Sequence, residues 1–184
     1  MKCSWILWQS QGSDKRLSRE EYRQCMERVA SCDTIEAVRD LLEVPEHVPS
    51  RMTQGFTFHF VRKDSRCRKP CWERFPRGGA WTFPLQCSQT TVVDRTWRRL
   101  VMGLASEALS DRRIIGVLVS RRESVFTLSI WHRNCSDVDA RGVEEEIRDL
   151  LQPERVCVVY TPFSRVIRLA KQALCLNPQI ACDA

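Results

Sequence analysis

Hydrophobic and polar residues alternate over several short stretches of this chain, a pattern that predicts β-strands. The clearest stretch is 55–63, where Phe56, Phe58 and Phe60 alternate with other residues. Short apolar runs rich in β-forming residues predict further strands at 4–10, 22–30, 80–86, 114–120, 125–131 and 155–161. The two runs that flank the polar "RRES" predict a β-hairpin.

Three other stretches have the spacing of amphipathic helices. Asp33, with Glu36 three positions later, forms a capping-box-like start, and Pro45 ends the helix that follows. Apolar residues recur at helical spacing over 91–109, with arginines on the opposite side. The stretch 137–151 repeats this arrangement, with an acidic run opposite its apolar side.

The predicted order is β-β-α-β-β-α-β-β-α-β, with successive strands pairing mainly as antiparallel neighbours. This order predicts an α+β fold, a single sheet of about seven to eight strands with three helices on one face and the other face free for a ligand. A chain of 184 residues buries roughly 70% of its unfolded surface, so we expect one domain over 1–184. Within the tail 163–184, residues 163–175 fit either a basic amphipathic helix or a mobile loop.

Net charge and cysteine content indicate which binding partners and which cellular compartment suit the chain. The formal net charge is +6, and the clustered arginines suit phosphate and stack on rings. No run approaches the ~20 apolar residues of a membrane span, and the first residues lack the features of a signal peptide. We therefore expect a cytoplasmic protein without a membrane partner. Its ten scattered cysteines are typical of reduced, mostly buried thiols.

Catalytic chemistry finds little support in this sequence. None of the three histidines, His47, His59 and His132, lies in a nucleophile, metal or general-base motif. A zinc site at Cys67, Cys71 and His59 would lack a fourth ligand and the usual spacing. The sequence therefore predicts neither an enzyme nor a cofactor.

A binding site is better supported, in the loop "KPCWERFPRGGAW" at 69–81. Trp72 stands there among charged residues, and Glu73 follows it directly. A carboxylate accepts the two parallel N–H donors of guanine's Watson–Crick edge. A positively charged ring such as N7-methylguanine, stacked on the indole, adds a cation–π attraction of ~0.5–2 kcal/mol. The pair therefore fits the messenger RNA 5′ cap, whose phosphates need arginine or lysine nearby.

Five motifs then resemble the cap-binding translation initiation factor 4E family, in order and over nearly the whole chain. "SWILW" resembles its first W-x-x-W strand, and "CDTIEAV" resembles its "FDTVEDFW" helix start. "PCWER…RGGAW" is similar to "PMWED…RGGRW". "DRTWRRLVMGLASEAL" and "GVLVSRR…TLSIW" are similar to "DRFWLETLLCLIGESF" and "GAVVNVR…KIAIW". The resemblance implies a divergent member with a curved antiparallel sheet backed by three helices.

The resemblance also implies a set of residues that bind the cap. Trp72 matches one stacking tryptophan, Glu73 the guanine-reading carboxylate, and Trp131 the tryptophan that contacts the N7-methyl group. The second stacking position, eleven residues before Asp33, falls on Tyr22. We expect Tyr22 to complete the sandwich, more weakly than an indole, because its π face is smaller.

The phosphate site departs from the family pattern. Arg122 matches the family's phosphate-binding arginine, but the family's lysine corresponds to Thr127 and the arginine after Gly-Gly corresponds to Ala80. Several residues remain open as replacements for the lost charge, namely Arg121, His132, Arg133, Arg165, Arg168 and Lys171.

The resemblance also implies that a protein partner binds the helical side of the molecule. Family members dock there a peptide of the initiation scaffold 4G or of a 4E-binding repressor. The corresponding positions in this chain are Ile35, Arg39, Arg98, Arg99 and Met102. The three arginines make this surface more basic than that of the family. We therefore expect a monomer that binds a partner with an altered motif, whose acidic residues face Arg39, Arg98 and Arg99.

The sequence thus predicts a protein that binds 7-methylguanosine-capped messenger RNA in translation initiation or its regulation. One alternative is an interaction or repressor module of the same fold with weak or lost cap affinity, for which Tyr22, Ala80 and Thr127 argue. Another is general single-stranded RNA binding, which would show strong salt dependence and little preference for the methyl group.

Overall fold

The structure, a computed structural model, describes residues 3–12, 24–63, 69–71, 74–109, 111–134, 137–152 and 157–166. Its strands are β1 (Trp5–Gln11), β2 (Met26–Cys32), β3 (Phe56–Arg62), β4 (Gly79–Gln86), β5 (Ile114–Arg121), β6 (Val125–His132) and β7 (Val159–Pro162). Its α-helices are α2 (Ile35–Glu43), α3 (Thr90–Ala105) and α4 (Asp137–Leu151). Two short 3₁₀ turns, η1 (Pro45–His47) and η2 (Pro49–Arg51), follow α2.

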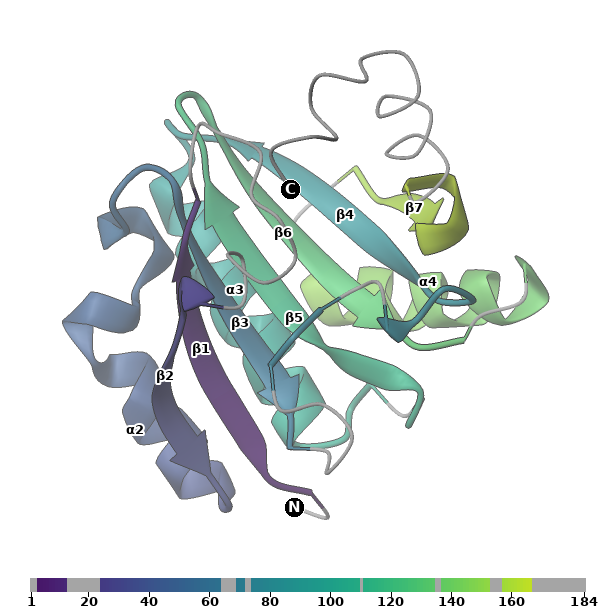
Figure 1. Ribbon diagram of the computed structural model, residues 1–184, viewed down its shortest axis with the longest axis horizontal. Helices are drawn as coiled ribbons and strands as arrows, with labels where there is room; N and C mark the ends of the chain where they lie inside the picture. Colours follow the sequence, from purple (N-terminus) through teal and green to yellow (C-terminus); the bar gives the residue numbers. More distant parts are fainter. Residues whose placement is uncertain are drawn as a thin grey trace.

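These strands form one antiparallel sheet in the order β2-β1-β3-β5-β6-β4-β7, and the α-helices cover one side of it (Figure 1). The predicted α+β fold and the predicted order of elements are confirmed within the described residues. Two pairs of successive strands, β1/β2 and β5/β6, are neighbours as expected. The successive strands β3 and β4 lie apart, because β3 pairs with β1 and β5.

One hydrophobic core fills the side of the sheet that the helices cover, which we call the helix face. Alternate strand residues, such as Phe58 and Phe60, pack there against the apolar sides of α2, α3 and α4. Trp5, Trp81 and Trp97, which the sequence pattern places in the core, are at most 2% exposed. Burying such a side chain contributes roughly 1.5–3 kcal/mol or more, so this core holds the helices on the sheet.

The other side of the sheet, the opposite face, carries two smaller hydrophobic clusters, and a bulge in β5 shapes one of them. The pairing of β5 with β6 shifts register between Ile114 and Gly116. A Cβ at Gly116 would lie 2.3 Å from the carbonyl oxygen of Phe60, so only glycine fits this close approach. As a result Ile114 joins the helix-face core, while Ile115 joins the cluster around Trp131.

The start of α2 differs by one residue from the prediction. Thr34, not Asp33, caps the helix, because its Oγ1 accepts a hydrogen bond from the backbone N–H of Ala37 at 3.1 Å. The backbone at Thr34 is still extended, with φ −132° and ψ 160°, so the first helical turn opens after it. The helix ends at Glu43, before Pro45, as predicted.

Other element ends also differ from the pattern. The α3 helix ends before the predicted Leu109, because Glu107 adopts a left-handed φ of 64°. In the described residues β2 begins at Met26 and β7 at Val159, each some residues later than expected. Residues 163–166 form one helical turn, and the rest of the predicted tail helix or loop lies outside the described residues.

Candidate functional site

Trp131 lies on the opposite face of the sheet. Leu128 and Ile130, which alternate with it along β6, belong to the helix-face core. The indole is 7% exposed, and two rings make T-shaped contacts with it. The centroid distances are 6.4 Å to His59 and 5.5 Å to Phe163. One side chain of the predicted cap site is therefore largely buried and held between two other rings.

His59 is a buried polar residue beside this indole. It projects from β3 on the same face, is 1% exposed, and its Nε2 lies 2.9 Å from the hydroxyl of Ser10. Burial lowers the pKa of His59 to about 3, because a charged imidazole would lose its hydration. The ring is therefore neutral at physiological pH.

Arg122 follows β5 at the end of the sheet, on the same side as Trp131 by strand alternation. Its backbone N–H donates to Val125 at 2.9 Å, and its exposed guanidinium lies 3.5 Å from the carbonyl oxygen of Gly55. Gly12 also donates to that carbonyl at 2.7 Å, and a Cβ at Gly12 would come within 3.0 Å of the Arg122 Nη1. The two glycines thus form a close-fitting support for the arginine.

Arg121 points the other way, although it precedes Arg122 directly. Its guanidinium lies 5.6 Å from the ring centroid of Phe126, a residue of the helix-face core. Its Nη1 donates to the carbonyl oxygen of Met52. These contacts occupy Arg121 on the helix face, away from Trp131.

The two positions that depart from the family pattern are both on the face that carries Trp131. Ala80 on β4 is buried in the same cluster, and Thr127 is half-buried on β6. Ser120 of β5 pairs with Thr127 and donates to its carbonyl oxygen at 3.5 Å. Between Trp131 and Arg122, this face therefore carries the hydroxyl groups of Ser120 and Thr127 instead of the ammonium group of the family's lysine.

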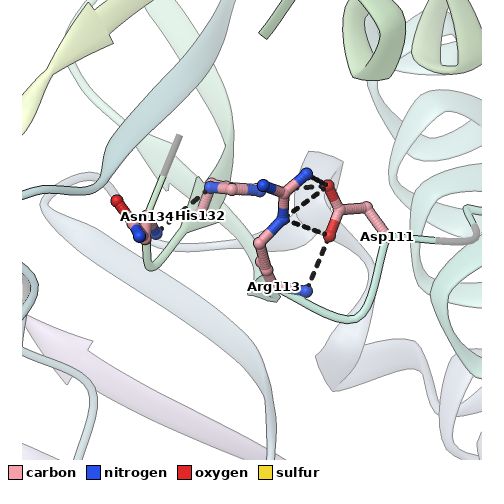
Figure 2. A network of polar contacts seen from close by, with 4 residues as sticks. All are labelled: Asp111, Arg113, His132 and Asn134. Carbon is pink, nitrogen blue, oxygen red and sulfur yellow. Dashed lines mark hydrogen bonds and ion pairs between the residues drawn. The ribbon is translucent and has the colours of Figure 1, made fainter. Parts of the chain in front are cut away.

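His132 and Arg133, two of the predicted charge replacements, lie at the other end of β6. His132 is fully buried, and Figure 2 shows it in a polar network with Asp111, Arg113 and Asn134. Its Nε2 donates to the Asp111 carboxylate at 3.2 Å, and its Nδ1 accepts from the Asn134 N–H at 3.3 Å. His132 is therefore engaged inside the fold. Arg133 is half-buried, and its backbone N–H donates to Arg113 at 3.0 Å.

The carboxylate of Asp111 holds this network together. The Arg113 backbone N–H, Nε and Nη2 donate to it at 2.7–3.1 Å. Burial alone would raise the pKa of Asp111, but hydrogen bonds from Arg113 and His132 lower it to about 2. The network ties the loop before β5 to the end of β6, at the border of the helix face.

The predicted partner surface lies on α2 and α3, on the helical side of the molecule. Ile35 and Met102 are half-buried, while Arg39 and Arg98 are exposed. The structure adds a contact that the sequence did not predict. Arg98 Nη1 lies 2.6 Å from Glu43 Oε1, and Arg98 Nη2 donates to the carbonyl oxygen of Leu42 at 3.5 Å.

Arg99 is also occupied within the chain. It donates to the carbonyl oxygens of Leu151 and Gln152 at 3.0 and 2.7 Å, and so caps the C-terminal end of α4. A partner with acidic residues would therefore have to compete with intramolecular contacts at Arg98 and Arg99.

Several predicted site residues lie outside the described residues, namely Tyr22, Trp72, Glu73, Arg168 and Lys171. Of the described residues that flank 72–73, Phe75 packs against the Trp131 cluster, and Cys71 is fully buried. Arg165 is exposed. The candidate zinc site also includes Cys67, which lies outside the described residues.

The cysteines that the structure describes are less buried than predicted. All those that the structure describes fully are free thiols, as expected. Cys32 and Cys71 are buried, Cys3 and Cys87 are half-buried, and Cys25 and Cys157 are exposed.

Sequence reasoning missed the pairing of Ser10 with His59. A signal was present, because His59 alternates with Phe58 and Phe60 and therefore had to face away from the helices. The partner could not be found the same way, since it comes from β1 and depends on the register of that strand with β3.

A family model described as eukaryotic initiation factor 4E matches residues 1–173 of this chain. Initiation factor 4E of Eremothecium gossypii is 23% identical over 159 residues, which cover 83% of this chain and 71% of that protein. Initiation factor 4E1 of Drosophila melanogaster is 27% identical over 154 residues, covering 80% of this chain and 56% of the fly protein. The chain belongs to the eukaryotic initiation factor 4E family.

Solved structures agree with this fold. The chain superposes on eIF4E-3 of Ascaris suum, crystallised with an m2,2,7G cap, with a TM-score of 0.74 at 23% identity over 88% of this chain and 89% of that one. It superposes equally well, at 21% identity, on C. elegans eIF4E-3 in complex with the 4E-binding protein Mextli and a cap analog, over 91% and 94% of the two chains. None of the helices described has both the length and the apolar character that a membrane span requires.

Proposed function

We propose that this chain binds the 7-methylguanosine cap of messenger RNA on the opposite face of its sheet, in translation initiation or its regulation. The observation that carries the proposal is the shared face of Trp131 and Arg122, in a chain that belongs to the initiation factor 4E family. About six residues of β6 separate the levels of the two side chains, or roughly 20 Å along the strand. In the proposed complex the base lies at Trp131, and the phosphates extend from it over this distance toward Arg122.

The base is held by three further residues in this proposal. Tyr22 and Trp72 stack on its two sides, and the positive charge of the methylated ring strengthens that stacking. Glu73 accepts the N–H donors of the Watson–Crick edge. Trp131 contacts the N7-methyl group from the floor of the site.

The phosphates are bound chiefly by Arg122, which the carbonyl of Gly55 orients. Thr127 supplies a hydroxyl where the family has a lysine. Arg121 takes no part, because its contacts lie on the helix face. Arg168 and Lys171 supply further charge in this proposal, whereas Arg133 lies beyond the end of β6 that is farther from Arg122. Fewer ammonium groups predict a weaker dependence of affinity on the number of phosphates.

A protein partner docks on α2 and α3, at Ile35, Arg39, Arg98 and Met102. The complex of C. elegans eIF4E-3 with Mextli supports a 4E-binding protein as the class of partner. A peptide whose acidic residues replace Glu43 at Arg98 would fit this surface. We place the whole activity in one monomeric domain of a cytoplasmic, non-enzymatic protein.

Calorimetric titration with N7-methyl-GTP and with GTP tests the proposal. Wild type should bind N7-methyl-GTP at least tenfold more tightly, and Glu73→Gln should lose most of this affinity, since it removes the charge that favours a cationic base. Arg122→Ala should weaken binding, whereas Arg148→Ala, which removes an exposed arginine of α4 paired with Glu144, should not. Equal affinity of wild type for both nucleotides contradicts cap recognition.

A further inference from the structure

His59 and Ser10 form a buried polar pair directly beside Trp131. His59 is 1% exposed and Ser10 is 3% exposed, and Ser10 Oγ lies 2.9 Å from His59 Nε2. The imidazole makes a T-shaped contact with the indole, with centroids 6.4 Å apart and planes 80° apart. His59 projects from β3, which lies next to β5, and Ser10 projects from β1, the strand on the other side of β3.

A histidine is an unfavourable choice for this position on packing grounds alone. His59 Nδ1 is buried and has no hydrogen-bond partner among the residues described, and an unpaired buried polar atom destabilises the folded state. Phenylalanine would fill a similar volume without that cost. What distinguishes His59 from an apolar residue at this position is its hydrogen bond to Ser10, so a role in the site would depend on that bond.

The hydrogen bond to Ser10 supplies that role, because it fixes the rotation of the imidazole about its χ2 angle. The ring edge that meets Trp131 is then fixed too, and Phe163 closes the indole from another direction at 5.5 Å and 75°. With both neighbours fixed, the indole has one orientation. Recognition of a single methyl group depends on an indole that is already held in place before the ligand binds.

The neutral state of His59 also suits a cationic base. An imidazolium beside Trp131 would repel N7-methylguanine, and burial of the ring away from water suppresses that charge. A lysine or arginine in this place would oppose the ligand in the same way.

We propose that His59, held by Ser10, is a positioning residue that fixes Trp131 and thereby sets how strongly this chain discriminates N7-methylated from unmethylated guanine. The inference rests on the proposed function, since it assigns the discrimination to Trp131. It predicts that changes at Ser10 or His59 alter methyl discrimination more than they alter the affinity for the nucleotide as a whole.

The test compares the ratio of the dissociation constants for GTP and N7-methyl-GTP in four variants, His59→Leu, Ser10→Ala, Trp131→Leu and His47→Leu. His47 is the matched control, because it makes a T-shaped contact with Phe58 at 6.3 Å and contacts the carbonyl oxygen of Leu41 at 2.9 Å, on the helix face. Melting temperatures of all variants report on the loss of stability separately.

His59→Leu should lower the ratio about three- to tenfold, the range that an aromatic contact supports. Ser10→Ala should lower it in the same direction by less, and it decides the question by itself if His59→Leu does not fold. His47→Leu should lower the melting temperature and leave the ratio within about twofold of wild type.

An unchanged ratio in both His59→Leu and Ser10→Ala, with a reduced ratio in Trp131→Leu, overturns this inference and leaves cap binding intact. A ratio that falls equally in His47→Leu also overturns it, because the effect would then follow stability. A wild-type ratio near one instead overturns the proposed function, and the inference with it.

Discussion

The two faces of the sheet bury their residues for different reasons. The helix face packs strand residues such as Phe60 and Trp81 against three helices in one apolar core. Among the described residues, the opposite face has two small clusters instead of one large core. Each side buries two polar residues, Thr96 and His132 on the helical side and Ser10 and His59 on the opposite face. Apolar burial stabilises any fold, whereas polar burial is costly. The two faces therefore differ in the size of their apolar clusters and in the partners of their buried polar groups.

A buried histidine on each face sharpens this comparison. His132, whose ring makes a T-shaped contact with Trp81 at 5.5 Å on the helix face, donates to the carboxylate of Asp111. His59 contacts the hydroxyl of Ser10 and no charged group among the described residues. His132 is thus part of an ionic network, whereas His59 is a neutral ring paired with a hydroxyl group.

The largest expected effect is acid destabilisation through His59. Its folded-state pKa of about 3 lies below the usual 6.5, so the unfolded chain binds more protons between these values. Stability should therefore fall as the pH drops from about 6.5 toward 3, by an amount on the order of 5 kcal/mol. Urea unfolding at a series of pH values measures this. His59→Gln should flatten the slope, and parallel curves for wild type and variant would refute the assignment.

A smaller effect is expected on the helix-face side, from Asp111→Asn. The change removes charge-assisted hydrogen bonds from Arg113 and His132 and should cost about 1–3 kcal/mol at pH 7. The folded-state pKa of Asp111 is lowered to about 2 from 3.8, so wild type loses this advantage as the pH falls through that range. Unfolding at pH 7 and near pH 2 tests the point. A cost that persists undiminished at the lower pH contradicts an electrostatic origin.

The smallest effect concerns the exposed ion pair on the helical surface. Arg98→Ala removes the contact with Glu43, where the two side chains are 47% and 63% exposed. Solvent and salt screen such a pair, so we expect almost no change in melting temperature at physiological salt. Affinity for a partner peptide with acidic residues should fall in the same variant. A large loss of stability would show that Arg98 serves the fold.

Most of the fold could be predicted because it depends on local patterns. The alternation of Phe56, Phe58 and Phe60 and the helical spacing around Trp97 decide which side chains meet the core. The errors lie where local rules compete. Asp33 and Thr34 are both capping residues, and the backbone geometry selects Thr34.

The site was less predictable, because it depends on register between distant strands. Strand alternation separates Arg121 from Arg122, yet the sequence offered both as phosphate ligands. Ser10 and His59 are 49 positions apart, and only the pairing of β1 with β3 brings them together. The resemblance to the family located Trp131 and Arg122, but it did not indicate what holds Trp131 in place.

The most direct test of the two-face account is an NMR titration that follows the indole N–H signals of the six tryptophans. Addition of N7-methyl-GTP should shift the signals of Trp131 and Trp72, while those of Trp5, Trp81 and Trp97 in the helix-face core stay in place. GTP at the same concentration should produce much smaller shifts. Shifts confined to the helix-face tryptophans, or equal shifts with both nucleotides, would contradict the claim that the opposite face recognises a methylated guanine.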